Sequence, residues 1–224
     1  MPTAAELIAA VKGADVERVA AIVADDPALA SSHDADGVSA LMLSRYRSNR
    51  AVTAALLAAD PDLDVFEAAA LGYLDRLRAC LEDDPAAVGS LSADGYTALH
   101  FAAFFAKPEA ARILLDAGAQ VGMVAANEMR VQPLHSAAAG RQIEICRLLL
   151  AGGAEVDARQ AGGFTPLHEA ARNGDPEMVE LFLSAGADPT ARTEDGRTAA
   201  DIAEGSAHPD VARRLRDIAA DRPA

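Results

Sequence analysis

A four-residue segment recurs along the chain at nearly constant spacing. It is clearest as TPLH from Thr165 to His168, and its equivalents begin at Thr97, Gln132 and Thr198. Successive copies start 35, 33 and 33 residues apart. A fixed period of this length is typical of a stacked repeat protein, in which each unit buries its apolar face only against its neighbours. Such a chain presents a long open surface without an enclosed chamber, which favours binding over catalysis.

The residue types within one period predict two short helices joined by a tight turn. Thr165 suits a helix N-cap, and Pro166 suits the first helical position, where its missing N–H is not needed. Gly174 and Gly186 suit helix ends that require a left-handed backbone. The second helix carries one apolar stripe at helical spacing, formed by Met178, Val179, Phe182 and Leu183.

The stretch 165–189, TPLHEAARNGDPEMVELFLSAGADP, resembles the ankyrin repeat. Residues 97–121 and 132–156 match it in register, each with an alanine pair in the first helix and a Gly-Ala step after the second. The resemblance implies an all-α fold, an ankyrin-repeat solenoid of about seven helix-turn-helix units with short hairpin-like fingers.

Weaker copies extend the pattern to both ends, so we expect one domain over 1–224. The unit 64–93 has no Asp-Gly turn, which predicts a shortened finger, and Asp201 replaces the motif histidine in the last unit. Terminal units with a polar outer face act as caps in solenoids. The expected division is an N-terminal cap unit at 1–35, repeats at 36–63, 64–93, 94–126, 127–161 and 162–194, and a C-terminal cap unit at 195–224.

Composition limits the partners and the compartment. The formal net charge of −14 argues against a nucleic-acid partner, because such proteins usually carry a basic footprint. The N-terminus fits neither a signal peptide nor a membrane span. Cys80 and Cys146 form no disulfide framework and are expected to be reduced, in a cytoplasmic and monomeric protein. The many alanines and only two lysines suggest a GC-rich bacterial source.

No catalytic or metal-binding constellation stands out. His100, His135 and His168 belong to different units, whose helices lie roughly 8–10 Å apart, whereas a zinc ion needs its nitrogen ligands about 2 Å away. We therefore interpret them as structural groups that satisfy buried backbone atoms. Nucleophile-elbow, phosphate-loop and metalloprotease motifs are lacking. We expect no catalytic residue, no cofactor and no metal.

The candidate binding residues follow from the resemblance, because partners of such proteins dock in a concave groove lined by fingertips and first-helix ends. Aligning the units on their alanine pairs places there Tyr46, Arg47, Tyr96, Phe104, Phe105, Phe164, Arg172 and Arg197. Aromatic and arginine side chains are favoured at interface hot spots. Alternatively, Phe104 and Phe105 fold back over the neighbouring unit and fill space left by the small alanines.

Two further features affect the groove. Arginines gather on this side towards the C-terminus, which favours a partner with acidic or apolar side chains; they are Arg141, Arg159, Arg172, Arg192 and Arg197. The finger between Gly118 and Gln132 is two residues longer than the period allows. Its methionines could form an adaptable contact, or the extra residues could be a tolerated insertion.

These patterns predict a non-catalytic protein-protein interaction scaffold, acting as an adaptor, an inhibitor or an assembly factor. The alternative is an enzyme or small-ligand binder with a pocket near the irregular segments 60–66 and 120–131. A pocket there with convergent polar groups and shifted pKa values would favour the alternative. A continuous open groove would favour the scaffold.

Overall fold

The computed structural model describes residues 1–221, in which fourteen α-helices form seven consecutive pairs and no strand is present. This confirms the expected all-α repeat fold. The pairs are α1 (Ala4–Lys12) with α2 (Val16–Asp25), α3 (Ala40–Tyr46) with α4 (Arg50–Leu57), α5 (Val65–Leu71) with α6 (Leu74–Asp83), α7 (Ala98–Phe104) with α8 (Pro108–Asp116), α9 (Pro133–Ala139) with α10 (Ile143–Ala151), α11 (Pro166–Arg172) with α12 (Pro176–Ser184), and α13 (Ala199–Gly205) with α14 (Pro209–Ala220). Three short 3-10 helices lie in the connections: η1 (Pro27–Ser31), η2 (Pro85–Gly89) and η3 (Ala161–Gly163).

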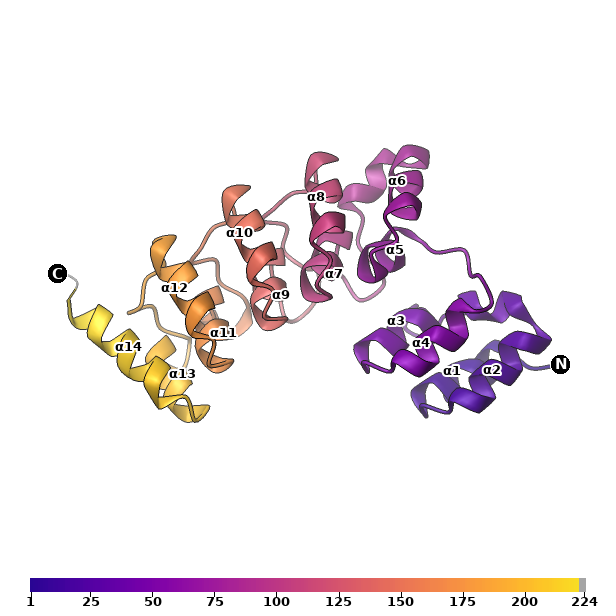
Figure 1. The fold of residues 1–224 in the computed structure, drawn as a ribbon, viewed down its shortest axis with the longest axis horizontal. Helices are drawn as coiled ribbons and strands as arrows, with labels where there is room; N and C mark the ends of the chain where they lie inside the picture. The colour runs from indigo at the N-terminus through magenta and orange to yellow at the C-terminus, as the bar shows by residue number, and fades with distance from the viewer. Residues whose placement is uncertain (222–224) are drawn as a thin grey trace.

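The helix pairs stack into an arch (Figure 1), with α5, α7, α9 and α11 on its inner side and α6, α8, α10 and α12 on its outer side. Each inner helix packs along the next. The alanine pairs make this possible, since Ala102 and Ala103 are completely buried, as are Ala137 and Ala138. Small side chains at these positions allow the helices to approach closely, while one leucine of each helix, Leu99, Leu134 or Leu167, is fully buried in the core.

The motif histidines join each unit to the next, as their structural interpretation requires. Each imidazole is about 1 % exposed, and its Nδ1 accepts the backbone N–H at the start of its own helix. Each Nε2 donates to a carbonyl just before the next helix start: His100 to Val131 at 3.1 Å, His135 to Phe164 at 3.3 Å, and His168 to Arg197 at 3.3 Å. These bonds satisfy backbone groups that would otherwise be buried without partners.

The regular stack is interrupted between α3 and α5. Helix α1 packs along α3 and α2 along α4, but the inner row that continues to α13 begins only at α5. The buried apolar side chains accordingly form two main clusters, one from Leu7 to Leu63 and one from Val65 to Leu215. In Figure 1 the α1–α4 block is set apart from the α5–α14 stack.

The sequence cause of this interruption is the missing finger in the connection 58–64. The fingers on either side, 33–39 and 91–97, then meet directly, and a Cβ on Gly37 would lie 3.0 Å from the Cβ of Ala93. A third, small cluster fills the junction, with Met42 from α3, Ala70 from α5 and Phe101 from α7 at its centre.

Candidate functional site

A pocket of about 240 Å³ opens where the fingers meet the ends of the inner helices. Five of its lining residues are aromatic, and we call it the aromatic pocket. Its lining is Tyr46, Tyr96, His100, Phe101, Phe104, Phe105, Met129, Val131, His135, Ser136, Ala139, Gln160, Glu169 and Arg172. Five of the eight binding residues expected from the sequence therefore lie together: Tyr46, Tyr96, Phe104, Phe105 and Arg172.

Phe101 lies at the centre of the aromatic group and is only 4 % exposed. Its ring centroid lies 5.6 Å from that of Tyr96, 6.1 Å from Phe66, 6.4 Å from Tyr46 and 6.5 Å from Phe105. Aromatic pairs attract each other at such separations beyond the area they bury. Sequence reasoning missed Phe101. It directly follows the motif histidine, a position occupied by Ser136 and Glu169 in the next two units, and all three side chains line the pocket.

Phe104 and Phe105 take different positions, so the two alternatives drawn from the sequence apply to one residue each. Phe104 is 44 % exposed at the end of α7. Phe105 is half-buried and packs on the small cluster around Met42 and Phe101. The two rings meet edge to face at 5.1 Å. The Phe104 ring is therefore open to solvent, and the half-buried Phe105 ring packs between it and the small cluster.

The polar groups around the pocket are largely engaged with one another. The Tyr46 hydroxyl donates to Asp94, and burial together with this carboxylate raises the pKa of Tyr46. The Glu169 side chain is 2 % exposed, pairs with Arg172, and accepts a 3.0 Å hydrogen bond from Gln160. Burial raises the pKa of Glu169, while Arg172 opposes that shift. Arg172 thus neutralises a buried carboxylate in the pocket wall.

The other three expected binding residues lie outside the pocket lining. Arg47 donates to the backbone carbonyl of Lys12 at 2.5 Å, so its guanidinium binds the first unit. The Phe164 ring packs on His168 of its own unit, with centroids 5.6 Å apart. Arg197 pairs with Asp195 on its own finger at 2.7 Å. Each is held by a local partner that the alignment on alanine pairs did not reveal.

The long finger forms one wall of the pocket through Met129, which is 53 % exposed. The finger is anchored to its neighbour, since Ala126 N–H donates to Gly95 O at 2.8 Å and the Asn127 side chain donates to Asp94 O at 2.9 Å. A Cβ on Gly95 would lie 2.6 Å from the Ala126 carbonyl oxygen, so only glycine permits this approach. The long finger therefore packs against the neighbouring finger and contributes Met129 and Val131 to the pocket lining.

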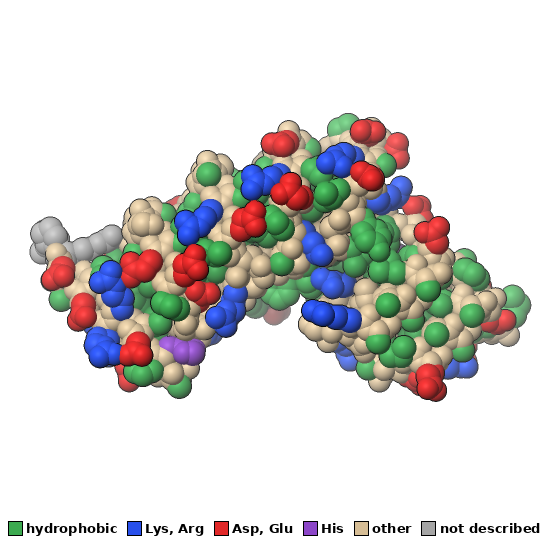
Figure 2. Space-filling view, in the orientation of Figure 1, with side chains coloured by type: hydrophobic (Ala, Val, Ile, Leu, Met, Phe, Trp, Pro, Cys, Tyr) green, Lys and Arg blue, Asp and Glu red, His purple; other side chains and the backbone are tan. Residues whose placement is uncertain are grey.

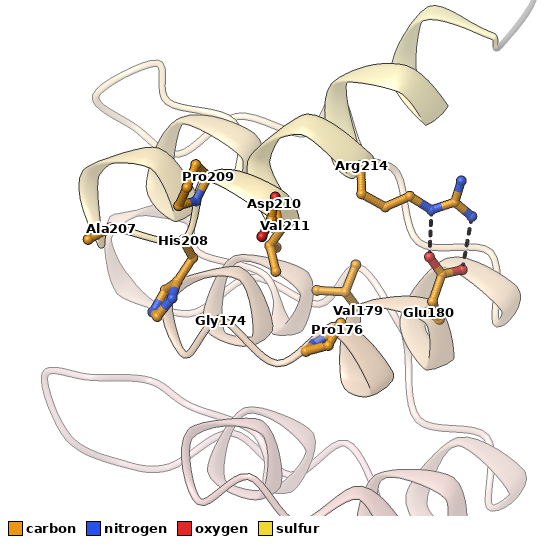
Figure 3. A pocket seen from close by; sticks show the side chains of 10 residues that line it. All are labelled: Gly174, Pro176, Val179, Glu180, Ala207, His208, Pro209, Asp210, Val211 and Arg214. Carbon is orange, nitrogen blue, oxygen red and sulfur yellow. Dashed lines mark hydrogen bonds and ion pairs between the residues drawn. The ribbon is translucent and has the colours of Figure 1, made fainter.

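A second hollow, of about 350 Å³, lies between α12 and α14 (Figure 3). Its charged groups face each other, and Arg214 Nε lies 2.7 Å from Glu180 Oε1. His208 covers Gly174, where a Cβ would lie 2.3 Å from the imidazole Nδ1. This hollow is a gap between two units, bridged by an ion pair across its rim.

The irregular segments 60–66 and 120–131 do not share a pocket. Asp60 to Leu63 line an open depression of about 410 Å³, whose Arg76 pairs with Asp62 at 2.6 Å and whose lining includes no Ser, Cys or His. Met129 and Val131 line the aromatic pocket instead. None of these three hollows is lined by residues of both segments. The aromatic pocket does contain groups with shifted pKa values, but they are engaged within the fold: His135 bonds to backbone carbonyls and Glu169 pairs with Arg172.

Within residues 1–221, no group of three or more His, Cys, Asp and Glu side chains is placed to hold a metal ion. Over the same residues, no helix combines the length and apolar character needed to cross a membrane. Both cysteines are free thiols; Cys146 is buried and Cys80 partly so.

Two family models match the chain. One, for ankyrin repeats in three copies, matches residues 65–160, and another, for ankyrin repeats in many copies, matches residues 148–203. Together they extend from the beginning of α5 into α13, the same stretch in which the inner helices pack regularly. The helices α1–α4 lie outside both matches.

Proposed function

Because the chain belongs to the ankyrin-repeat family, whose repeats generally mediate contacts between proteins, we propose that it binds another protein on the inner side of its arch. It would do so as a non-catalytic scaffold, in the role of an adaptor, an inhibitor or an assembly factor. The site is the aromatic pocket, with Phe104 as the main anchor and Tyr46, Tyr96, Phe105 and Arg172 around it.

The observation that carries this proposal is an exposed aromatic ring beside a preformed apolar pocket. In a chain with only 4 % aromatic residues, five aromatic side chains line this single pocket. Exposed apolar clusters of this kind mark interaction sites, and aromatic anchors dominate interface energetics. Its volume of about 240 Å³ is below the range of about 300–1,000 Å³ typical of small-molecule sites. A side chain of a protein partner fits that volume better than a free ligand.

The proposal also places the protein in the cytoplasm of a bacterium, as a monomer without a nucleic-acid, membrane or cofactor partner. Two free cysteines fit a reducing compartment. The net charge of −14 disfavours binding to a polyanion.

The first prediction tests the anchor. Replacing Phe104 with alanine should weaken partner binding by at least about 2 kcal/mol, the scale of an interface hot spot. The fold should lose little stability, because the ring is 44 % exposed. Quantitative affinity capture from the native cells, combined with thermal melts, measures both effects.

The matched control is Tyr73→Ala, which removes an aromatic ring of similar exposure, 46 %, from outside the pocket. We expect this variant to retain the partner. Equal capture by wild type, Phe104→Ala and Tyr73→Ala would refute the proposed site.

A further inference from the structure

Three positive charges that influence one another have no acidic partner, and one of them, Arg45, lies over the Phe105 ring of the aromatic pocket. Arg45, Arg50 and Lys107 form what we call the cationic cluster, and none of them lies within 4.0 Å of a carboxylate in residues 1–221. In Figure 2, Lys and Arg side chains lie on both sides of the hollow between the α1–α4 block and the rest of the arch. Twelve of the other cations in residues 1–221 are ion-paired. Of the rest, Arg47, Arg159 and Arg192 donate to backbone carbonyls.

Burial and a neighbouring positive charge both disfavour the charged forms of Arg45 and Lys107. Burial and then the charge of Arg50 lower the pKa of Arg45. Burial and then the charge of Arg45 lower the pKa of Lys107. Arg50 opens α4 and Lys107 immediately precedes α8, although helix N-termini favour anions over cations.

Within the fold, Arg45 and Lys107 have few hydrogen-bond acceptors and no ion-pair partner for their positive charges. The Arg45 guanidinium lies 4.5 Å from the centroid of the Phe105 ring and makes one long hydrogen bond, 3.5 Å, to the carbonyl of Ala70. Its Nε is buried and has no hydrogen-bond partner. The Lys107 stem passes beside Gly72 without an ion-pair partner for its ammonium. Local conflicts of this kind are expected at functional sites.

The acidic groups near the pocket are, by contrast, already engaged. Asp94 accepts hydrogen bonds from the hydroxyls of Tyr46 and Ser92. Glu169 pairs with Arg172 and accepts from Gln160. The charged groups near the aromatic pocket that have no partner of opposite charge are therefore cations. A ligand with complementary charge would be an anion.

We propose that the aromatic pocket and the cationic cluster together bind an acidic segment of a partner protein. An aromatic or large aliphatic side chain of that segment enters the pocket beside Phe104, and its aspartates or glutamates pair with Arg45, Arg50 and Lys107. Phe105 links the two halves of the site, since its ring lines the pocket and lies beneath Arg45. The carboxylates therefore lie within a few residues of the apolar anchor. This inference rests on the proposed function and specifies the partner's chemistry.

A nucleic acid is the other ligand with matching charge, and the structure favours it less. Three cations neutralise few phosphates, and the net charge of −14 repels a polyanion. The neighbouring pocket is apolar and suits a hydrophobic side chain better than a phosphate backbone.

The test uses a displayed library of random twelve-residue peptides, selected on the immobilised full chain. We expect enriched peptides to combine a large apolar residue with two or more nearby Asp or Glu residues. The Kd of the most enriched peptide, measured by fluorescence anisotropy, should rise at least about fivefold with Lys107→Gln and again with Arg50→Gln. The charge-conserving variants Lys107→Arg and Arg50→Lys should retain most of the wild-type affinity for that peptide. Arg213→Gln, which removes an exposed charge on α14, is the matched control and should change nothing.

Arg50→Gln should leave the melting temperature unchanged or slightly raised, because it removes a cation from a helix N-terminus. Enrichment of basic or uncharged peptides, or a Kd insensitive to Lys107→Gln, would overturn this inference. So would failure to select any peptide, or tight binding of a twelve-nucleotide single-stranded DNA that Lys107→Gln abolishes. If selected peptides depend on Phe104 but not on the cluster, the proposed function stands and only this inference fails. If native partner capture is also independent of Phe104, both fail.

Discussion

The imidazoles of His100 and His135 show how a single side chain can stabilise a stack of repeats. Each is about 1 % exposed and bonds to backbone atoms of two successive units. Burial lowers the pKa of both groups to about 4, despite the opposing effect of their hydrogen bonds to carbonyls. The folded protein therefore holds them neutral at a pH where the unfolded chain already takes up protons.

The direction of the pH dependence follows from this difference. Between pH 6.5 and pH 4 these two imidazoles bind more protons in the unfolded chain than in the folded one, so their contribution to the free energy of unfolding falls as the solution is acidified. From pH 7 to pH 5 we predict a loss of roughly 2 kcal/mol for each of the two imidazoles. Urea denaturation at both pH values measures it.

The comparison variant is His135→Gln, which keeps an amide donor near the same carbonyls but cannot titrate. Its loss of stability between pH 7 and pH 5 should be smaller than that of the wild type by about 2 kcal/mol. Glu67 and Glu169, whose pKa values are raised by burial, act in the opposite direction in both proteins and cancel in the difference. An identical pH dependence in the two proteins would contradict the structural role of His135.

Among the structural elements, the fingers determine where the aromatic pocket forms. The connection 58–64 supplies none, so the finger 33–39 contacts the finger 91–97 and brings Tyr46 of α3 to the aromatic rings of α7. The long finger after α8 then places Met129 over the same site. The short connection 58–64 and the long finger after α8 therefore both determine the shape of the aromatic pocket.

Two glycines allow the long finger to be tested. Gly95 has φ +83° and a Cβ there would meet the Ala126 backbone, whereas Gly118 has φ +94° with open space around it. We predict that Gly118→Ala costs about 1 kcal/mol of stability, the backbone strain alone. Gly95→Ala should cost about 1–3 kcal/mol more, because the finger must move away. Denaturant melts of the two variants measure the difference, and equal losses would show that the finger contact contributes nothing.

The sequence predicted the regular elements well, because caps, alanine pairs and period all indicated the same helices. Thr97, Pro166 and the motif histidines lie where local physics places them. The pocket was predicted only in part. Tyr46 and Phe105 meet across an irregular junction, and alignment in register cannot show that two fingers touch across a missing one. Phe101 was missed because its position follows the motif rather than the alanine pair.

At the scale of the whole molecule, the chain holds two main apolar cores joined through a small aromatic junction. Stability in a repeat protein is the sum of local and neighbour terms, so regions with different neighbours open separately. We predict that amides of α7–α12, which have regular neighbours on both sides, exchange most slowly with solvent hydrogen. Amides of α1–α4 should exchange in a separate, less stable step, and hydrogen-exchange mass spectrometry resolves the two. Uniform protection across both blocks would argue against independent cores.

The placement of the tyrosines gives the site a property of its own. The chain contains no tryptophan and three tyrosines, and two of these, Tyr46 and Tyr96, line the aromatic pocket. Two of the three tyrosine chromophores therefore lie at the site, and Tyr73 is the third. Binding of a segment that lacks tyrosine and tryptophan should therefore change the intrinsic tyrosine fluorescence of the protein, and this change can be used to follow binding without a label.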